Sequence, residues 1–465
     1  MNNQKGFVGI VVIFVVLAIA SVVGYYIVSQ KPTPTKQVSE DSAQNDISPT
    51  NSQDEVNQLP VVPQTQTGTP TINNQPKPDQ TATPKPTPAP INPPPPPPSS
   101  VSSSKIDSCR TITTAGEYFL SGDLINIKSE PCIKIQNVSN VSFDCQNHTI
   151  TSKSENYNIY VKGSSDFKIN NCKLVSSLNV PLEKGTQEVL KIEDSKRGDL
   201  NNNTIAGNFA EIRGSSFLTA NNNTFNTQLF VYKSNNVTLK NNNFNFVSGG
   251  IVLRLQDGNN NSLISNVLDG KDDGIFESKD GTDDVVFLDN EDNDLIQGNT
   301  LRNAYECAIE FNRVVGLRII SNTVNNTGLS FLCGWHYVSA KNITVKDNVV
   351  NNSPSLFWFF RERALRVNEQ YVYFQDNLFE NNKLTNPKIS TGFSFGAMID
   401  FNRSIVPSQN YIIGNNILRN NDFTKLVGSL RLAPANIVTD GGGNICFGAE
   451  EEAMGGGDAI PFNCN

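Results

Sequence analysis

The chain has few of the side chains that hold transition metals or nucleic acids. Only two histidines and three methionines occur in 465 residues, which argues against His-rich or Met-rich metal sites. The 37 lysines and arginines are outnumbered by 45 acidic residues, so the clustered basic charge that neutralises a phosphate backbone is not expected. We therefore expect neither a nucleic-acid partner nor a copper centre.

Asparagine, by contrast, is in large excess. About 62 residues, or 13% of the chain, are asparagine, whereas all charged residues together make up 18%. Charged residues average about a quarter of a globular domain, so asparagine takes much of the share that charge normally has. This excess predicts a repeated structural role for the asparagine side chain.

The N-terminal part of the chain divides into two segments of different composition. Residues 7–28 are uncharged and almost wholly apolar, and as a helix they would extend about 33 Å, enough to cross a bilayer. We predict a transmembrane anchor over 1–29. A cleaved secretory signal is the alternative, with the A-x-A pattern at 18–20 as its cleavage site. Residues 30–104 hold 18 of the 25 prolines and predict a disordered, extended linker.

The eight cysteines show no C-x-x-C or Cys/His zinc spacing. An even set at spacings of about 20 to 30 residues predicts disulfides between neighbours in sequence, although eight cysteines allow 105 pairings. Eight buried thiols in a cytosolic protein are the alternative, which the apolar N-terminal segment disfavours. We expect a single-pass cell-membrane protein with an extracytoplasmic C-terminal domain. The predicted pairs are Cys109–Cys132, Cys145–Cys172, Cys307–Cys333 and Cys446–Cys464.

From residue 105 onward the sequence repeats itself every 20 to 25 residues. Each unit contains an apolar residue, two polar residues, an asparagine, any residue and an apolar residue, and a short alternating strand pattern precedes it. The aligned asparagines are Asn203, Asn223, Asn242, Asn266, Asn299, Asn322, Asn348, Asn377 and Asn416.

A short repeat of strands without helical periodicity predicts a parallel β-helix of about 12 to 14 coils over 105–465. Its coils would stack about 4.8 Å apart, so the repeated asparagines would lie above one another and bond from coil to coil. Cys172 occupies the same slot in INNCKL. The fold class is therefore all-β.

The segments SCRTITTAGEYFLSGDL and VSFDCQNHTI resemble the N-terminal coil of right-handed parallel β-helix proteins of the pectin-lyase-like class, and the NNNTI units resemble their repeats. The class includes polysaccharide lyases, hydrolases, epimerases, binding proteins and adhesins, so the resemblance implies the fold more than a function. Polygalacturonase-type members use an Asp pair, Gly-His-Gly and Arg-Ile-Lys. Here only Asp272 and Asp273 match, and residues 317–320 read LRII.

The spacing of the repeat asparagines widens after Asn266, and the run 271–294 contains ten acids and two lysines. Insertions in a solenoid commonly build its binding site. Glu277 and Glu310 each lie eleven residues after an aligned asparagine, and Asp273 and Glu306 each lie seven after theirs. We predict that these acids stack as catalytic pairs, in which one carboxyl keeps a raised pKa.

Aromatic and basic residues follow on the next predicted coils. His336 is the next residue expected in the column of Glu310, with Trp335 beside it, and Trp358 and Arg361 come one coil later. Aromatic rings stack on sugars while paired carboxylates transfer protons, so these residues predict contacts to a polysaccharide. The reaction would be that of a polysaccharide lyase or a glycoside hydrolase.

Two alternatives stand beside this hypothesis. The stacked carboxylates can instead coordinate Ca²⁺ or a lysine, and the run DNEDND at 289–294 is rich in oxygen ligands, although it lacks the glycine and distal glutamate of an EF-hand. The protein can also be a non-catalytic surface adhesin or spacer, which the long linker and the absence of a complete catalytic motif favour.

Overall fold

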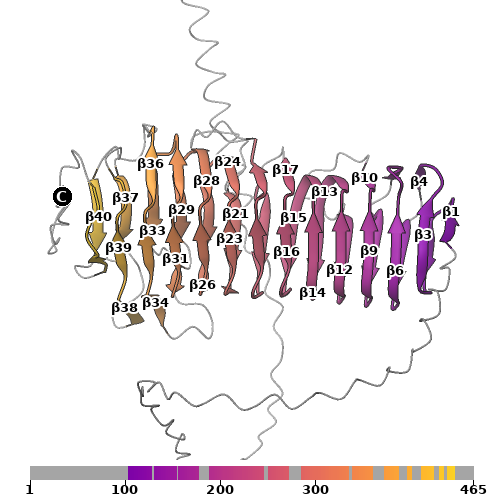
Figure 1. Cartoon of the computed structure of the whole chain (residues 1–465), viewed down its shortest axis with the longest axis horizontal. Coiled ribbons are helices and arrows are strands. Elements are labelled where there is room, and N and C mark those ends of the chain that lie inside the picture. The colour runs from indigo at the N-terminus through magenta and orange to yellow at the C-terminus, as the bar shows by residue number, and fades with distance from the viewer. Residues whose placement is uncertain are drawn as a thin grey trace, which may run out of the picture. The chain divides into compact units, whose positions relative to one another are not determined.

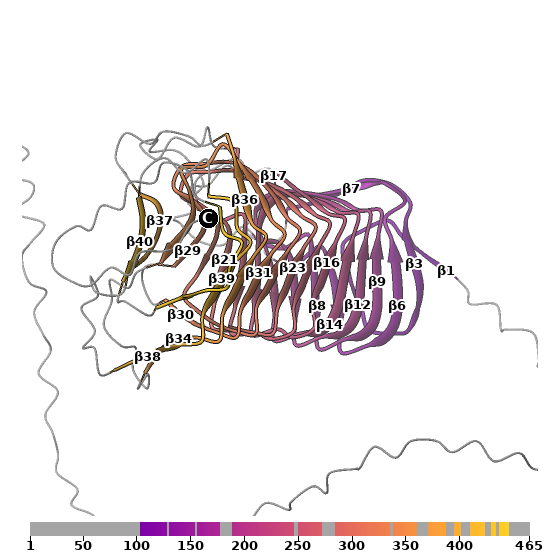
Figure 2. The ribbon, with the colours of Figure 1, turned by 60° about the vertical axis from the view of Figure 1, so that its left-hand side comes forward.

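The computed structural model describes residues 103–445, except for the segments 128–129, 154–155, 177–187, 246–249, 272–283, 335–337, 360–370, 387–394, 401–409, 424–428 and 434–436. These residues form a right-handed parallel β-helix, in which every strand pair is parallel. Figures 1 and 2 show the strands stacked along one axis. The predicted fold is therefore confirmed.

The coils contribute strands to three rows, called here PB1, PB2 and PB3 in the order in which they follow one another around a coil. PB1 contains β2 (Arg110–Ile112), β5 (Ile133–Gln136), β8 (Ile159–Lys162), β11 (Glu188–Glu193), β13 (Thr204–Arg213), β15 (Thr224–Tyr232), β18 (Leu253–Gln256), β21 (Asp284–Asp289), β25 (Cys307–Phe311), β29 (Ser330–Gly334), β33 (Ser355–Phe359), β37 (Phe395–Asp400) and β40 (Ser429–Ala433).

PB2 is a 14-stranded sheet with one strand per coil, which agrees with the predicted 12 to 14 coils. It contains β1 (Ser103–Ile106), β3 (Gly116–Leu120), β6 (Ser139–Asp144), β9 (Ser165–Asn170), β12 (Lys196–Asn201), β14 (Ser216–Asn221), β16 (Thr238–Lys240), β19 (Ser262–Ile264), β23 (Leu295–Gln297), β27 (Arg318–Ile320), β31 (Thr344–Lys346), β35 (Leu378–Glu380), β39 (Ile417–Arg419) and β41 (Thr439–Asp440).

PB3 is a row of short strands that joins PB1 in a 22-stranded sheet, because β13 and β15 run through both rows. Its other strands are β4 (Leu124–Asn126), β7 (Thr149–Ser152), β10 (Lys173–Ser176), β17 (Asn243–Asn245), β20 (Val267–Asp269), β24 (Thr300–Ala304), β28 (Thr323–Thr327), β32 (Val349–Asn351) and β36 (Lys383–Thr385). A five-stranded sheet follows PB1 in the C-terminal half, with β22 (Glu291–Asp292), β26 (Arg313–Val315), β30 (Ser339–Lys341), β34 (Val372–Gln375) and β38 (Tyr411–Gly414).

The asparagine ladder lies at the bend between PB2 and PB3. In each step the side-chain oxygen of one asparagine accepts bonds from the backbone N–H and the side-chain amide of the asparagine one coil earlier. For Asn203 and Asn223 both distances are 2.9 Å. The ladder is buried and continues through Asn348, as predicted, and Cys172 occupies its first slot by donating its N–H to Asn203.

After Asn348 the predicted alignment is wrong. Asn348 bonds to Asn382, which bonds to Asn421 and then Asn444. Asn377 and Asn416 instead form part of a second column five residues earlier on the coil. The same sequence pattern occurs at both columns, so spacing alone did not separate them.

A second use of asparagine appears in the backbone. The residue before each ladder asparagine has a positive φ, between 54° and 56° at Asn202, Asn222 and Asn241. Asparagine tolerates this left-handed conformation better than other residues with a Cβ, because its short side chain bonds locally. The excess of asparagine therefore serves both the ladder and the bends.

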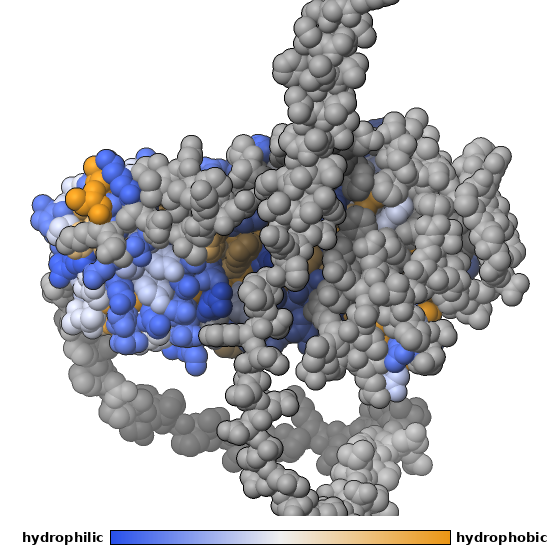
Figure 3. All heavy atoms as spheres, turned by 180° about the vertical axis from the view of Figure 1, so that it is seen from behind, coloured by the Kyte–Doolittle hydropathy of each residue, from blue (hydrophilic) through white to orange (hydrophobic). Residues whose placement is uncertain are grey.

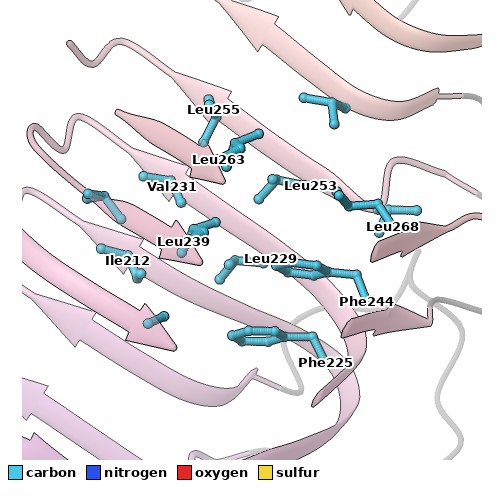
Figure 4. Packing of buried hydrophobic residues seen from close by; sticks show 14 of the residues in the cluster. Ile212, Phe225, Leu229, Val231, Leu239, Phe244, Leu253, Leu255, Leu263 and Leu268 are labelled. Atoms are coloured by element: carbon cyan, nitrogen blue, oxygen red, sulfur yellow. The ribbon is translucent and has the colours of Figure 1, made fainter. Parts of the chain in front are cut away.

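The core is a continuous stack of aliphatic and aromatic side chains inside the coils (Figure 4). Phe225 and Phe244 stack with ring centroids 4.7 Å apart and planes within 7°. Leu239 and Leu263, from PB2, are paired in register and fully buried. Each coil thus buries its apolar side chains against those of its neighbours.

Three of the four predicted disulfides are confirmed, namely Cys109–Cys132, Cys145–Cys172 and Cys307–Cys333. The predicted pair Cys446–Cys464, the anchor over 1–29 and nearly all of the linker over 30–104 lie outside the described residues. Within the described residues, no helix has the length and apolar character needed to cross a membrane.

Candidate functional site

Residues of ten successive coils, from β5 to β33, share one register column on the outward side of PB1. The core residues on either side of each member point inward, so strand alternation turns the column outward. Its members, called here the outer PB1 column, are Lys134, Tyr160, Lys191, Glu211, Phe230, Arg254, Phe287, Glu310, Cys333 and Trp358.

Three carboxylates gather near the C-terminal part of this column. Asp284 begins β21, Glu306 directly precedes β25, and Glu310 is the fourth of the five residues of β25. One carboxylate oxygen of each lies within 4.8 Å of the others. Asp284 and Glu310 are buried, at 2% and 4% exposure, and Asp284 also accepts a bond from the N–H of Cys307. We call this group the carboxylate cluster.

Two of the four predicted catalytic residues, Glu306 and Glu310, therefore lie together. The predicted stacking of Glu277 on Glu310 is wrong, because Phe287 is the register partner of Glu310. Asp273 is not aligned with Glu306 either, since Asp284 pairs with the following residue. The prediction counted residues from Asn266 and made no allowance for an insertion in this coil. The PB1 strand that follows Asn266, β21, starts only at Asp284. Asp273 and Glu277 themselves lie outside the described residues.

Of the four predicted substrate contacts, only Trp358 lies within the described residues. Cys333, not His336, is the residue beside Glu310 on the next coil, because Cys307 aligns with Ser330. Trp358 follows in the same column but is only 4% exposed, so it offers no open ring face to a ligand. Trp335, His336 and Arg361 lie outside the described residues.

The acidic run 289–294 does not converge on one calcium site. Glu291 and Asp294 turn into the coil interior, where each is 1% exposed, and Asp292 instead faces Arg313 at 3.5 Å. Glu291 accepts bonds from the N–H of Gly258 at 2.8 Å and from the amide of Asn261 at 3.0 Å. The acids of this run therefore point in different directions, and Ca²⁺ binding stays a prediction.

Sequence reasoning missed a second group, at the N-terminal end of the outer PB1 column. The rings of Tyr157 and Tyr160 stack with centroids 5.1 Å apart. Lys191 lies 2.9 Å from Glu211 and 3.7 Å from Glu188, and its ammonium sits over the Tyr157 ring at 5.6 Å. Burial raises the pKa of Glu188 and, together with that carboxyl, the pKa of Tyr157.

Aromatic and cationic side chains continue between the two groups. The Arg213 guanidinium lies 4.4 Å from the centre of the Tyr232 ring, and that of Arg254 lies 5.1 Å from the centre of Phe287. Arg213 also binds Glu211 at 2.5 Å. The sequence does carry a trace of this band, because strands such as IYVK, LKIE and AEIR each place one polar or aromatic residue outward between two core residues. The lengths of the coils vary, however, so these strands cannot be aligned by counting residues.

The geometry therefore defines a band of rings and charges along PB1 that leads to the carboxylate cluster. On the face seen in Figure 3, the described surface is mostly hydrophilic, with separate hydrophobic patches. A long, polar ligand with apolar ring faces would match such a band, because it could contact several coils in turn.

No family model matches the sequence, and no curated protein matches it. Among solved structures, a mannuronan C-5 epimerase A-module from Azotobacter vinelandii is similar over 66% of this chain and 90% of its own, at 11% identity and a TM-score of 0.40. A surface adhesin of Streptococcus pneumoniae is similar over 68% and 83%, at 13% identity and a TM-score of 0.40. A polygalacturonase from Erwinia carotovora is similar over 64% and 100%, at 12% identity and a TM-score of 0.35. These likenesses are too distant to transfer an activity.

Proposed function

We propose that this protein binds an extended polysaccharide along PB1 and modifies it at the carboxylate cluster. The observation that carries the proposal is the meeting of Asp284, Glu306 and Glu310 within 4.8 Å at one end of the aromatic and charged band. A chain lying across PB1 would cross one coil about every 4.8 Å and would meet the partly exposed residues Lys134, Tyr160, Lys191, Phe230 and Arg254. It would therefore reach the cluster while still held by several coils.

The cluster supports two chemical states. Three carboxylates this close need a counter-charge or a shared proton, and a cation such as Ca²⁺ or a basic side chain would supply the charge. A shared proton gives Glu310 the role of general acid, and a bound cation would neutralise an acidic sugar. Both states make Glu310 central to the reaction, as a lyase or a hydrolase would need.

The location of the protein belongs to the same proposal. An N-terminal membrane anchor followed by the proline-rich linker would hold the β-helix away from the membrane, where a cell-surface polysaccharide is accessible. Three confirmed disulfides support an extracytoplasmic environment, because disulfides persist in oxidising compartments.

The test compares the purified full-length chain with its Glu310→Gln variant. Polygalacturonate, alginate and a neutral glucan are offered as probes, with and without CaCl₂, and both retention of the probe and release of new reducing or unsaturated ends are measured. We expect one probe to be bound by the wild type and product release to fall at least about 100-fold in the variant.

Glu117→Gln is the matched control, since Glu117 is an exposed carboxyl on β3 of PB2. It should leave both readouts unchanged. A polysaccharide that is bound equally by all three proteins, with no product from any, would refute the catalytic role and leave the adhesin function. Calcium titration followed by calorimetry separates the two states of the cluster, because only cation binding should produce heat that Glu310→Gln removes.

A further inference from the structure

A cavity of about 350 Å³ opens on the outward surface of PB2, away from the carboxylate cluster. It lies over β6, β9, β12 and β14, and Phe167 forms its floor. This volume is at the lower end of the range for small-molecule sites. The polar and aromatic side chains that line it are Asn140, Asp166, Lys168, Arg197, Asp199 and Phe217.

Two of these residues stand in a backbone position that disfavours them. One residue has a positive φ at the second position of β6, β9, β12 and β14 and two residues before each later PB2 strand up to β39, and the register aligns these residues from coil to coil. Arg197 and Phe217 have φ values of 51° and 57°. The rest of this column consists of residues that accept the left-handed conformation, namely Asn140, Asp166, Asn236, Asn260, Asn293, Gly316, Asn342, Asp376 and Asn415.

The left-handed conformation disfavours residues with a large side chain, so the chain keeps Arg197 and Phe217 here against the local preference. Packing does not explain Phe217, because its side chain is 59% exposed. It is one of five strongly exposed large apolar residues in the described part of the chain, the others being Ile125, Ile127, Val349 and Ile445. Strained residues that do not serve the core commonly serve a ligand.

Arg197 is held in a fixed orientation beside this ring. Its Nε and Nη2 atoms bind the two oxygens of Asp166 at 2.6 and 2.7 Å. Such a two-point pair fixes the plane of the guanidinium, and its remaining N–H groups stay available to a ligand. On the adjacent strands Lys168 and Asp199 are register partners, so the cavity carries two acids and two bases.

We propose that this cavity is a second saccharide site, which binds a neutral pyranose unit with its ring face against Phe217 and its hydroxyls at Arg197 and Asp199. The balanced charge does not favour an anionic or cationic ligand, whereas donors and acceptors beside one exposed ring suit a ligand with hydroxyls around an apolar face. The site lies on PB2 and does not depend on the carboxylate cluster.

The decisive variant is Phe217→Asn. It removes the ring and restores the residue type that the same position has on the next coils, so it should leave the Tm unchanged or higher. The full-length wild type and variant are applied to an array of neutral oligosaccharides built from glucose, galactose, mannose and N-acetylglucosamine. We expect the wild type to bind at least one probe, and Phe217→Asn to bind it about tenfold or more weakly.

Two further variants sharpen the result. Arg197→Lys keeps the charge but loses the planar fork, so it should also weaken binding, whereas Val349→Asn removes another exposed apolar residue and should not. Saturation-transfer NMR should place the bound sugar against an aromatic ring in the wild type and not in Phe217→Asn.

Three results would overturn the proposal. They are the absence of binding to every neutral probe, equal binding by Phe217→Asn, and weakened binding that comes with a lower Tm. Binding that is lost in Glu310→Gln but kept in Phe217→Asn would also refute it, because the probe would then occupy PB1. Failure of this second site leaves the polysaccharide function of PB1 untouched, since the two variants report on separate surfaces.

Discussion

Glu291 and Asp294 form a buried acid pair inside the coils, and its titration should control stability. Glu291 takes a position that serine occupies on earlier coils, where Ser164, Ser195 and Ser215 bond in sequence. A side chain at Gly258 would lie 2.3 Å from a backbone oxygen, so glycine leaves the room for Glu291. Burial and the charge of Asp294 hold the pKa of Glu291 far above its usual range, and burial raises the pKa of Asp294.

The sign of the pH effect follows from the direction in which both pKa values move. Both carboxyls titrate near pH 4 in the unfolded chain and at higher pH in the folded protein. The folded state therefore holds more protons, and stability is fully present below about pH 4 and is lost as pH rises through the folded pKa values. A pKa that is higher by 1 in the folded chain corresponds to about 1.36 kcal/mol, and burial can raise the pKa of a carboxyl by about 3 or more. We expect the free energy of unfolding to fall by about 3–5 kcal/mol between pH 4 and pH 9 because of this pair.

The substitution Asp294→Asn tests this reasoning. Asparagine is neutral at every pH and can donate to Glu291 as the protonated acid does. The variant should match the wild type at pH 4 and exceed its free energy of unfolding by about 2 kcal/mol at pH 8, measured by urea denaturation across this range. Asp376→Asn, the same change at an exposed bend residue, is the control and should show no such pH-dependent gain. Equal loss of stability at all pH values in Asp294→Asn would refute the account.

Two further predictions concern the scaffold. Asn266→Ala removes the acceptor of the Asn242 N–H, at 2.8 Å, and should lower the free energy of unfolding by about 2–4 kcal/mol, while the bend variant Asn241→Ala should lose only about 1 kcal/mol in the same urea titration. Replacing both Cys307 and Cys333 by serine opens a cross-link over 26 residues and should lower the free energy of unfolding by about 3 kcal/mol, measured from the denaturation midpoint. An unchanged midpoint in Asn266→Ala or in the double serine variant would contradict the role assigned to that asparagine or disulfide.

The fold was predictable because one sequence pattern recurs once per coil with a physical reason for each position. The apolar residues fill the core and the asparagine must bond to the next coil, so the pattern predicts both the solenoid and the ladder through Asn348. It failed at Asn377 because two columns, five residues apart, use the same pattern. Only the hydrogen bonds distinguish Asn382 as the true continuation.

The candidate site was predictable only in part. Which side chains lie side by side depends on the register of neighbouring coils, and an insertion changes that register by an amount that the sequence does not reveal. Glu306 and Glu310 were found from their spacing after Asn299, but their partner Asp284 was not, since the inserted residues before β21 shift the count. Glu291 and Asp294 were mistaken for surface ligands because charge normally implies exposure. Burial of a protonated acid cannot be read from the residue type alone.

The hydrogen-bond lengths in the ladder depend on the distance between coils and not on the number of residues between successive ladder asparagines. Asn203 and Asn223 are 20 residues apart and Asn266 and Asn299 are 33 apart, yet the backbone-to-side-chain distances are 2.9 and 2.8 Å. Lengthening such a loop costs only about 0.6 kcal/mol for each doubling. The corners of this solenoid can therefore exchange, gain or lose whole loops with little loss of stability, which makes the scaffold a suitable host for grafted recognition loops.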